Sequence, residues 1–200
     1  MTAALFASAA RLLTGAIPRW HGCAPEQRAR IYFANHTSNL DFVLLWSSLP
    51  TPCRRQTRPV AAHDYWTGSK LRRWLAESVF RAVLIERHNV TRDNNPLEPM
   101  LTALRGGDSL IIFPEGTRNP SGELGPFRPG LHHLARAMPE AELVPVFIEN
   151  LNRVLPKGEV LPVPILCSVH FGTPVRLEPG ETKPAFLARA REAVLAMKPV

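Results

Sequence analysis

Residues 30–49, RIYFANHTSNLDFVLLWSSL, place a strand pattern, a polar loop and a helix pattern in direct succession. Residues 30–34 are rich in the aromatic and β-branched side chains that strands favour. Residues 40–49 form a longer apolar run, which predicts a buried helix. The polar residues between them therefore lie where a strand ends and a helix begins. In sheets covered by helices, binding and catalytic sites gather at such strand ends.

The rest of the chain alternates in the same way. Short apolar runs predict further strands at residues 59–62, 82–85, 109–113, 143–148 and 165–171. Longer patterns predict helices at residues 66–80, 96–105, 131–137 and 183–197. This alternation implies an α/β fold, with a largely parallel sheet flanked by helices on both faces. The sequence contains no internal repeat, so we expect residues 21–200 to form a single domain.

Residues 1–20 are expected to form a separate amphipathic helix. Its apolar residues recur at helical spacing and are Leu5, Phe6, Ala9, Leu12, Leu13, Ala16 and Ile17. The apolar run is shorter than the roughly twenty residues that span a bilayer, and Arg11 interrupts it. Two interpretations stay open: the helix lies in the membrane interface, or it packs on the protein's own core.

The chain is basic, with 24 lysines and arginines against 17 aspartates and glutamates and a formal net charge of +7. This charge suits a phosphate-rich partner, such as a nucleic acid, an anionic lipid or a phosphorylated substrate. On the charge alone, a solvated basic surface is the favoured interpretation. The sequence contains no recognised nucleic-acid-binding motif, so we expect no nucleic acid partner.

Cysteines and histidines are not arranged as metal ligands. Cys23, Cys53 and Cys167 are far apart and odd in number, which argues against a disulfide framework and a cysteine-rich zinc site. His132 and His133 are adjacent and have no carboxylate at ligand spacing, so we expect them on a helix surface. The sequence therefore predicts no metal site.

His36 is the first candidate catalytic residue, because it sits in the loop that enters the predicted helix. Asp41 follows five residues later, within reach of the imidazole once the chain turns into the helix. A carboxylate on one ring nitrogen fixes the tautomer and leaves the other nitrogen to accept a proton. The alternative is a helix cap, formed by Ser38 or Asn39 with Asp41 favouring the helix dipole.

A second candidate loop, FPEGTR at residues 113–118, follows the most apolar strand pattern. Gly116 allows a tight turn, and the backbone N–H groups of such a turn can hold a phosphate together with Thr117 and Arg118. An ordinary polar turn is the alternative. Arg87 follows the strand pattern at residues 82–85, and by itself it is equally a surface charge.

Four blocks, in this order, resemble the glycerolipid acyltransferase family, which includes the lysophosphatidic acid acyltransferases. NHTSNLD at residues 35–41 matches the family's Asn-His-x4-Asp motif. FRAVLIERHN at residues 80–89 is similar to its intermediate block, and FPEGTR matches its Glu-Gly-Thr-Arg block. LVPVFI at residues 143–148 is similar to its late Val-Pro block. FRPG, which follows FPEGTR, resembles the family's Phe-Lys-x-Gly, with Arg128 in place of the lysine.

The resemblance implies roles for these residues and a glycerol-3-phosphate acyltransferase-like fold. His36 would be the general base and Asp41 the residue that orients it. The remaining residues would form the substrate site, with Glu115 shaping its loop; they are Asn35, Arg87, Glu115, Gly116, Thr117 and Arg118.

The resemblance also implies an O-acyltransferase of phospholipid biosynthesis. We expect it to transfer a fatty acyl group from acyl-CoA or acyl carrier protein to the hydroxyl of 1-acylglycerol 3-phosphate, giving phosphatidate, without a cofactor. We expect a peripheral or monotopic protein at the cytoplasmic face of the cell membrane. The alternatives are transfer to another lysolipid, acyl hydrolysis, and a catalytically silent membrane-binding relative.

Overall fold

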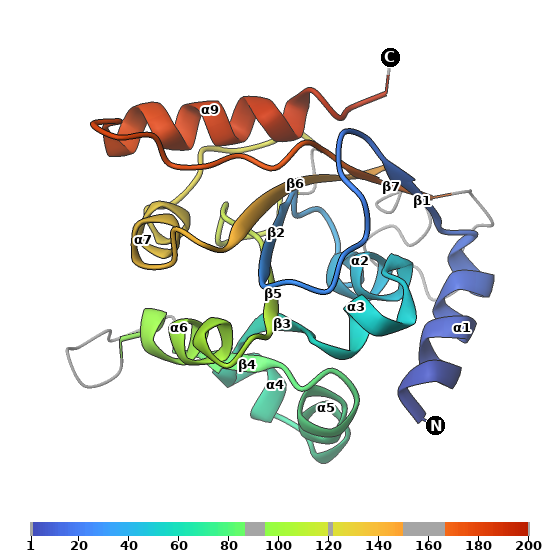
Figure 1. Ribbon diagram of the computed structural model, residues 1–200. Helices are drawn as coiled ribbons and strands as arrows, with labels where there is room; N and C mark the ends of the chain where they lie inside the picture. The colour runs from blue at the N-terminus through green and yellow to red at the C-terminus, as the bar shows by residue number, and fades with distance from the viewer. Residues whose placement is uncertain (1, 87–94, 120–121, 150–166, 200) are drawn as a thin grey trace.

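The computed structural model describes residues 2–86, 95–119, 122–149 and 167–199. They contain a seven-stranded sheet with the strand order β1-β7-β6-β2-β5-β3-β4 (Figure 1). The strands are β1 (Ile17–Trp20), β2 (Arg30–Ala34), β3 (Thr57–Ala62), β4 (Val83–Ile85), β5 (Ser109–Ile112), β6 (Glu142–Glu149) and β7 (Ser168–Phe171).

Every described pair of neighbouring strands is parallel except β6 and β7. The central strand β2 lies between β5 and β6, where Tyr32 is in register with Ile111 and Val144. All five residues of β2 are buried, which explains why its sequence lacks the polar alternation of a half-exposed strand. Because β2, β5 and β6 run in the same direction, their carboxyl ends meet at one edge of the sheet.

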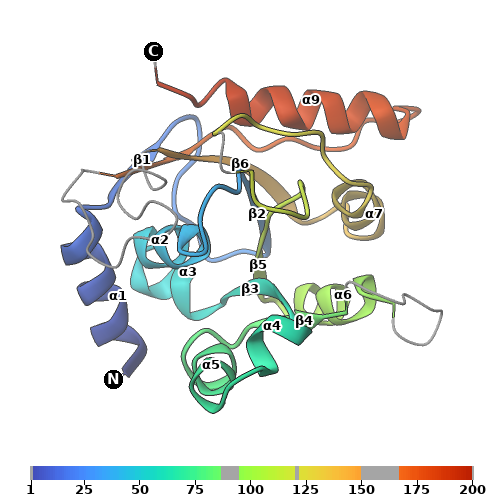
Figure 2. The ribbon, with the colours of Figure 1, turned by 180° about the vertical axis from the view of Figure 1, so that it is seen from behind.

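Helices cover both faces of this sheet (Figures 1 and 2). On one face lie α6 (Leu97–Arg105), α7 (Gly130–Ala137) and α9 (Lys183–Leu195). On the other lie α1 (Thr2–Thr14), α2 (Asp41–Ser48) and α3 (Thr51–Arg55). Two short helices, α4 (His63–Thr67) and α5 (Lys70–Trp74), and the π-helix η1 (Leu75–Val79) lie between β3 and β4 in the chain. The expected α/β fold with a largely parallel sheet is confirmed.

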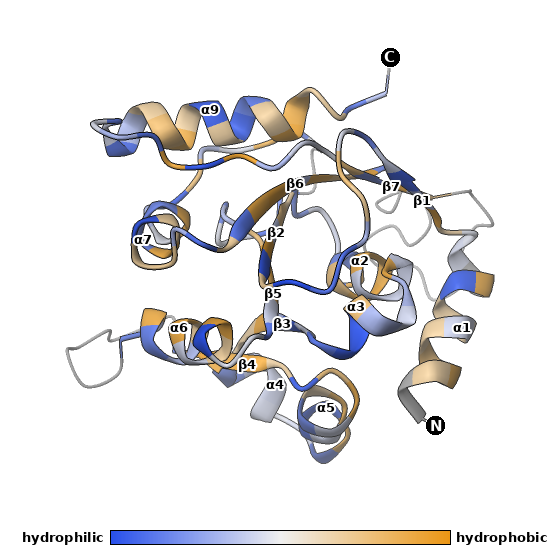
Figure 3. Cartoon of the chain, viewed as in Figure 1, coloured by the Kyte–Doolittle hydropathy of each residue, from blue (hydrophilic) through white to orange (hydrophobic). Residues whose placement is uncertain are grey.

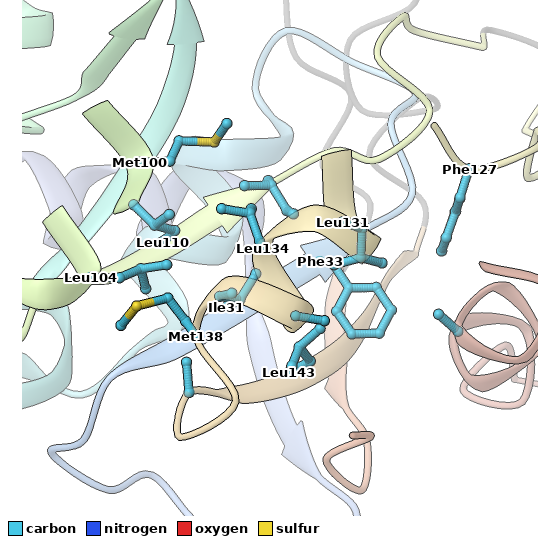
Figure 4. Packing of buried hydrophobic residues seen from close by; sticks show 14 of the residues in the cluster. Ile31, Phe33, Met100, Leu104, Leu110, Phe127, Leu131, Leu134, Met138 and Leu143 are labelled. Carbon is cyan, nitrogen blue, oxygen red and sulfur yellow. The ribbon is translucent and has the colours of Figure 1, made fainter. Parts of the chain in front are cut away.

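The core beneath α6 and α7 is a continuous apolar cluster (Figure 4). Ile31 and Leu110 project from β2 and β5, and they meet Leu104 from α6 and Leu134 from α7. All four side chains are at most 2% exposed. Burying a side chain of this size contributes about 1.5–3 kcal/mol, so this packing fixes the strands whose ends carry the candidate site.

The segment at residues 66–80 differs from its prediction of one continuous helix. Helix α4 ends at Thr67, and a new helix begins after Ser69, whose side chain accepts a hydrogen bond from the backbone N–H of Arg72. The helix then widens into η1 at Leu75. The capping serine explains the restart, because it offers the first turn a partner that a mid-helix residue would not.

The N-terminal helix ends earlier than expected, at Thr14, and residues 17–20 form the edge strand β1. One side of the helix packs on the protein: Ala7 is buried, and Phe6 makes an edge-to-face ring contact with Phe80 at 5.3 Å. Leu5 and Leu12 point outward and are exposed. The core-packing interpretation therefore holds for one side of α1, while interface contact through the other side stays a prediction.

Within the part of the chain described by the structure, no helix combines the length and apolar character that crossing a membrane requires.

A buried ion pair ties β2 to β6. The guanidinium of Arg30 is only 2% exposed, and it lies 2.9 Å from a carboxylate oxygen of Glu142. It also donates a hydrogen bond to the backbone oxygen of Ala24 at 2.6 Å. On its outer side Arg30 is 4.0 Å from Glu26, which is well exposed. Glu142 is thus the close, sheltered partner of this charge.

We expect Glu142→Ala to lower the free energy of unfolding by about 3 kcal/mol, because it leaves the buried Arg30 charge without its close partner. Urea denaturation measures this loss. Glu26→Ala is the matched control, and it should cost less than about 1 kcal/mol because exposed ion pairs are weak. Equal losses in the two variants would show that the Arg30–Glu142 pair does not tie the sheet together.

Candidate active site

A cavity of about 690 Å³ opens at the carboxyl edge of β2 and β5. One part of its wall is polar and is formed by His36, Thr117, Arg118, Arg128 and His133. The rest is largely apolar and includes Phe42, Trp66, Phe80, Met100, Leu131 and Leu134. The cavity thus joins a cationic end to a largely apolar region.

His36 and Asp41 form a close pair at this cavity. The Nδ1 atom of His36 lies 2.7 Å from Oδ2 of Asp41, which has no exposed side-chain surface. The same oxygen accepts the backbone N–H groups of Thr37 at 2.7 Å and Ser38 at 2.8 Å. Three donors converge on this one buried oxygen and hold the carboxylate in place. With the carboxylate beside Nδ1, the ring keeps its proton there, and Nε2 is the nitrogen able to accept one.

Of the capping interpretation, only the acidic residue in the first turn is present; the residue at the N-cap is Leu40, and no side chain caps the helix. Helix α2 begins at Asp41, whose carboxylate accepts N–H groups that precede the helix. Ser38 stabilises the turn before the helix, with its hydroxyl accepting the N–H of Leu40 at 3.2 Å. The loop therefore holds Asp41 in place and turns it toward His36 with the same hydrogen bonds.

The ring of His36 is also fixed by stacking. It lies on the ring of Phe113, with centroids 4.2 Å apart and planes inclined by 17°. Phe113 directly follows β5, so the stacking couples the ends of two neighbouring strands. The His36 side chain stays 21% exposed, which leaves it open to the cavity.

Glu115 links the two candidate loops from beneath. Its carboxylate accepts the backbone N–H of His36 at 2.8 Å and that of Gly125 at 2.9 Å. Its own backbone oxygen accepts a hydrogen bond from Nε of Arg128 at 3.0 Å. Glu115 is buried, so these contacts position the loop that the sequence analysis expected it to shape.

Gly116 makes the turn that presents Thr117 and Arg118 to the cavity. Its backbone φ of 73° lies in the left-handed region, which residues with a side chain rarely adopt. A Cβ at this position would lie 2.5 Å from Nε of Arg128, so glycine also leaves room for that arginine. Thr117 and Arg118 are both exposed and line the cavity. The turn thus presents Arg118 to one end of the cavity and leaves room there for Arg128.

Asn35 faces the neighbouring strand. Its side-chain amide donates to the backbone oxygen of Ile148 at 3.0 Å and accepts the N–H of the same residue at 2.7 Å. Asn35 is buried, and it fastens the end of β2 to β6 one residue before His36. Direct contact of Asn35 with a substrate stays a prediction. Arg87 lies outside the described residues.

Two residues of this wall were missed as site residues in the sequence analysis. Arg128 stands in the FRPG block as a family substitution, and its role appears only when the fold brings it over Gly116. His133 lines the cavity, whereas it was expected on a helix surface. Its neighbour His132 is buried and stacks edge-to-face near Phe186 of α9. The prediction that His132 lies on a helix surface was wrong, because α9 covers that side of α7. Burial lowers the pKa of His132.

Comparison with known proteins agrees with this geometry. Residues 19–149 match the family model described as Acyltransferase. Over 178 residues the chain is 29% identical to human 1-acyl-sn-glycerol-3-phosphate acyltransferase alpha, with 86% of this chain and 60% of that protein covered. It is 26% identical over 157 residues to the 1-acyl-sn-glycerol-3-phosphate acyltransferase of Cocos nucifera, covering 76% of this chain and 47% of that protein. The chain therefore spans about half to three fifths of the length of these two relatives.

The fold has a solved counterpart. The crystal structure of the 1-acyl-sn-glycerophosphate (LPA) acyltransferase PlsC from Thermotoga maritima superposes with a TM-score of 0.76, covering 98% of this chain and 77% of that chain. The sequence identity of 20% makes this a likeness of fold. The family model covers well over half of the sequence, including the His36–Asp41 pair and the Glu115–Arg118 loop. The chain belongs to the Acyltransferase family.

Proposed function

We propose that the protein transfers a fatty acyl group from a thioester to the free hydroxyl of 1-acylglycerol 3-phosphate, giving phosphatidate in phospholipid biosynthesis. The observation that carries the proposal is the His36–Asp41 pair at the polar end of a cavity that is otherwise largely apolar. The names of the relatives supply the acceptor, because arginines recognise a phosphate but not the molecule that bears it.

In the proposed reaction, Nε2 of His36 takes the proton of the acceptor hydroxyl while that oxygen attacks the carbonyl carbon of the thioester. The tetrahedral intermediate then collapses, the carbon–sulfur bond breaks, and the thiolate takes the proton back from the imidazolium. Asp41 stabilises that imidazolium through Nδ1. The transfer is direct, so it needs neither a covalent acyl-enzyme nor a cofactor.

The cationic end of the cavity is the proposed phosphate site. Arg118 and Arg128 line it, and Thr117 adds a hydroxyl. Arginine suits a phosphate because its guanidinium donates two parallel hydrogen bonds. The apolar wall would then hold acyl chain, from the acceptor or from the donor thioester of coenzyme A or acyl carrier protein. We further propose that the protein acts at the cytoplasmic face of the cell membrane, attached peripherally or monotopically.

The direct test is acyl transfer from labelled acyl-CoA to lysophosphatidate by the purified protein. We expect His36→Ala to lower kcat by about 10²–10⁴-fold, the usual contribution of a general base. His21→Ala, at an exposed histidine just after β1, is the matched control and should keep full activity. Circular dichroism would check that both variants remain folded.

Full activity in His36→Ala would contradict the proposed base. Product from other lysolipids but not from lysophosphatidate would move the assignment to another acceptor. A folded wild-type protein that fails with every donor and acceptor would be the silent relative.

Arg118→Ala should raise KM for lysophosphatidate by about 10–100-fold, because it removes charge-assisted hydrogen bonds to the phosphate. The kcat at saturation should change little. Monoacylglycerol, which lacks the phosphate, serves as the control acceptor, and its weak reaction should not depend on Arg118. An unchanged KM for lysophosphatidate would place the phosphate elsewhere.

Direct transfer also predicts resistance to thiol reagents. Cys53 and Cys167 are buried, and burial raises the pKa of all three thiols, that of Cys167 to about 11. A raised pKa keeps each thiol protonated and unreactive at neutral pH, with reactivity appearing only as the pH rises. We expect iodoacetamide at pH 7.5 to leave acyl transfer unchanged. Inactivation that substrate prevents, and that Cys23→Ser does not abolish, would indicate a cysteine at the reacting centre.

A further inference from the structure

A short projection between β3 and β4 exposes large apolar side chains. Residues 63–74 form α4 and α5, which we call the α4–α5 arm. Leu71 is 66% exposed and Trp74 is 46% exposed. These two residues are three positions apart on α5, so they lie on the same side of the helix. Together they give this short helix a small exposed apolar surface.

The same helix is basic. Lys70, Arg72 and Arg73 alternate with the apolar pair and are exposed. Figure 3 shows hydrophobic and hydrophilic residues next to each other on α5. The guanidinium of Arg72 lies over the ring of Tyr65, 4.5 Å from its centroid, so the charge rests on an aromatic side chain of α4. Such a mixture suits the boundary between lipid chains and anionic headgroups, where aromatic rings settle and long basic side chains reach outward.

The α4–α5 arm is also a wall of the active-site cavity. Tyr65 and Trp66 line the cavity from α4, and Phe80 lines it from the residues after η1. Trp66 contacts Phe42 edge-to-face at 5.5 Å, and Phe42 contacts Phe80 in the same way at 5.0 Å. This aromatic cluster joins the arm to α2, so the exposed side of α5 keeps a fixed position beside the cavity.

We propose that the α4–α5 arm is the docking surface of the protein on an anionic phospholipid bilayer, with Leu71 and Trp74 entering the headgroup boundary and Lys70, Arg72 and Arg73 meeting the phosphates. This position holds a wall of the cavity against the membrane. If the proposed function is correct, a lysolipid then passes between bilayer and site without crossing water; the docking itself does not depend on the reaction.

The size and chemistry of the arm favour a bilayer over an acidic protein. Helix α5 has five residues, whereas a stable protein interface buries roughly 800 Å² on each partner. A bilayer needs no matching shape and absorbs an exposed leucine and tryptophan directly. A second exposed apolar surface, formed by Leu5 and Leu12 on α1, is a rival docking site, and it enters the test as a comparison.

The experiment is co-sedimentation of the full chain with vesicles of phosphatidylcholine containing phosphatidylglycerol, and with pure phosphatidylcholine. We expect the double variant Leu71→Ser/Trp74→Ser to bind anionic vesicles at least about tenfold more weakly. The triple variant Lys70→Gln/Arg72→Gln/Arg73→Gln should lose roughly tenfold and most of the preference for phosphatidylglycerol. Because these side chains are exposed, the variants should melt at the wild-type temperature.

Two controls separate the arm from the rest of the surface. Leu12→Ser removes an even more exposed leucine from α1 and should reduce vesicle binding by less than about twofold. Arg105→Gln/Arg136→Gln/Lys198→Gln removes the same charge elsewhere and should keep the preference for anionic vesicles. If both arm variants bind anionic vesicles as tightly as the wild type, the proposal is overturned. It is also overturned if Leu12→Ser is the only variant that no longer binds the vesicles. Unchanged vesicle binding with lost binding to acyl carrier protein would make the arm a protein-docking surface instead.

Acyl transfer to a dispersed short-chain lysophosphatidate tests the function separately. Leu71→Ser/Trp74→Ser should react like the wild type with this substrate and lose activity only with vesicle-borne lysophosphatidate. If neither the wild type nor the variants transfer acyl groups while vesicle binding still depends on the arm, the proposed function is wrong and the proposed docking surface is supported. If transfer depends on His36 while vesicle binding ignores the arm, the reverse holds.

Discussion

The parallel pairing of β2 with both β5 and β6 brings the site together. Residues far apart in the chain end their strands at the same edge, so His36 after β2 and Glu115 after β5 meet within hydrogen-bond distance. Since β2 is buried on both sides, a register shift would move its whole apolar set, and the packed helices prevent it. The rigid sheet therefore carries the precision that catalysis needs, and the loops only add the functional groups.

Glu115 connects the sheet edge to the loops that carry His36 and Arg128. A buried carboxylate normally demands a cation, yet this one is satisfied by two backbone N–H groups, from His36 and Gly125. It therefore holds the backbone of His36 in place, while Asp41 holds the imidazole through Nδ1. The backbone oxygen of the same residue holds Arg128. One residue thus sets the spacing between His36 and the cationic end of the cavity.

Local chemistry was predictable from the sequence, and long-range contacts were not. The five-residue spacing of His36 and Asp41 allows the pair but also a helix cap, and the resemblance of the four blocks favoured the pair, which the turn of the chain does bring together. By contrast, the Asn35–Ile148 hydrogen bonds join residues more than a hundred positions apart, and no spacing rule reports them. The direction of β7 was equally hidden, since an apolar run fits a parallel or an antiparallel neighbour. Arg128 and His133 enter the site only through the turn at Gly116 and the packing of α7.

The cavity and the α4–α5 arm place opposite demands on the same segment. Trp66 must stay packed to keep the wall, while Leu71 and Trp74 a few residues later remain in contact with solvent. The break between α4 and α5 resolves this conflict, because a continuous helix would carry its apolar stripe along one face. Ser69 starts a new helix whose apolar side points outward. The widened turn of η1 then returns the chain to the core at Val79 and Phe80, where the aromatic cluster closes the cavity.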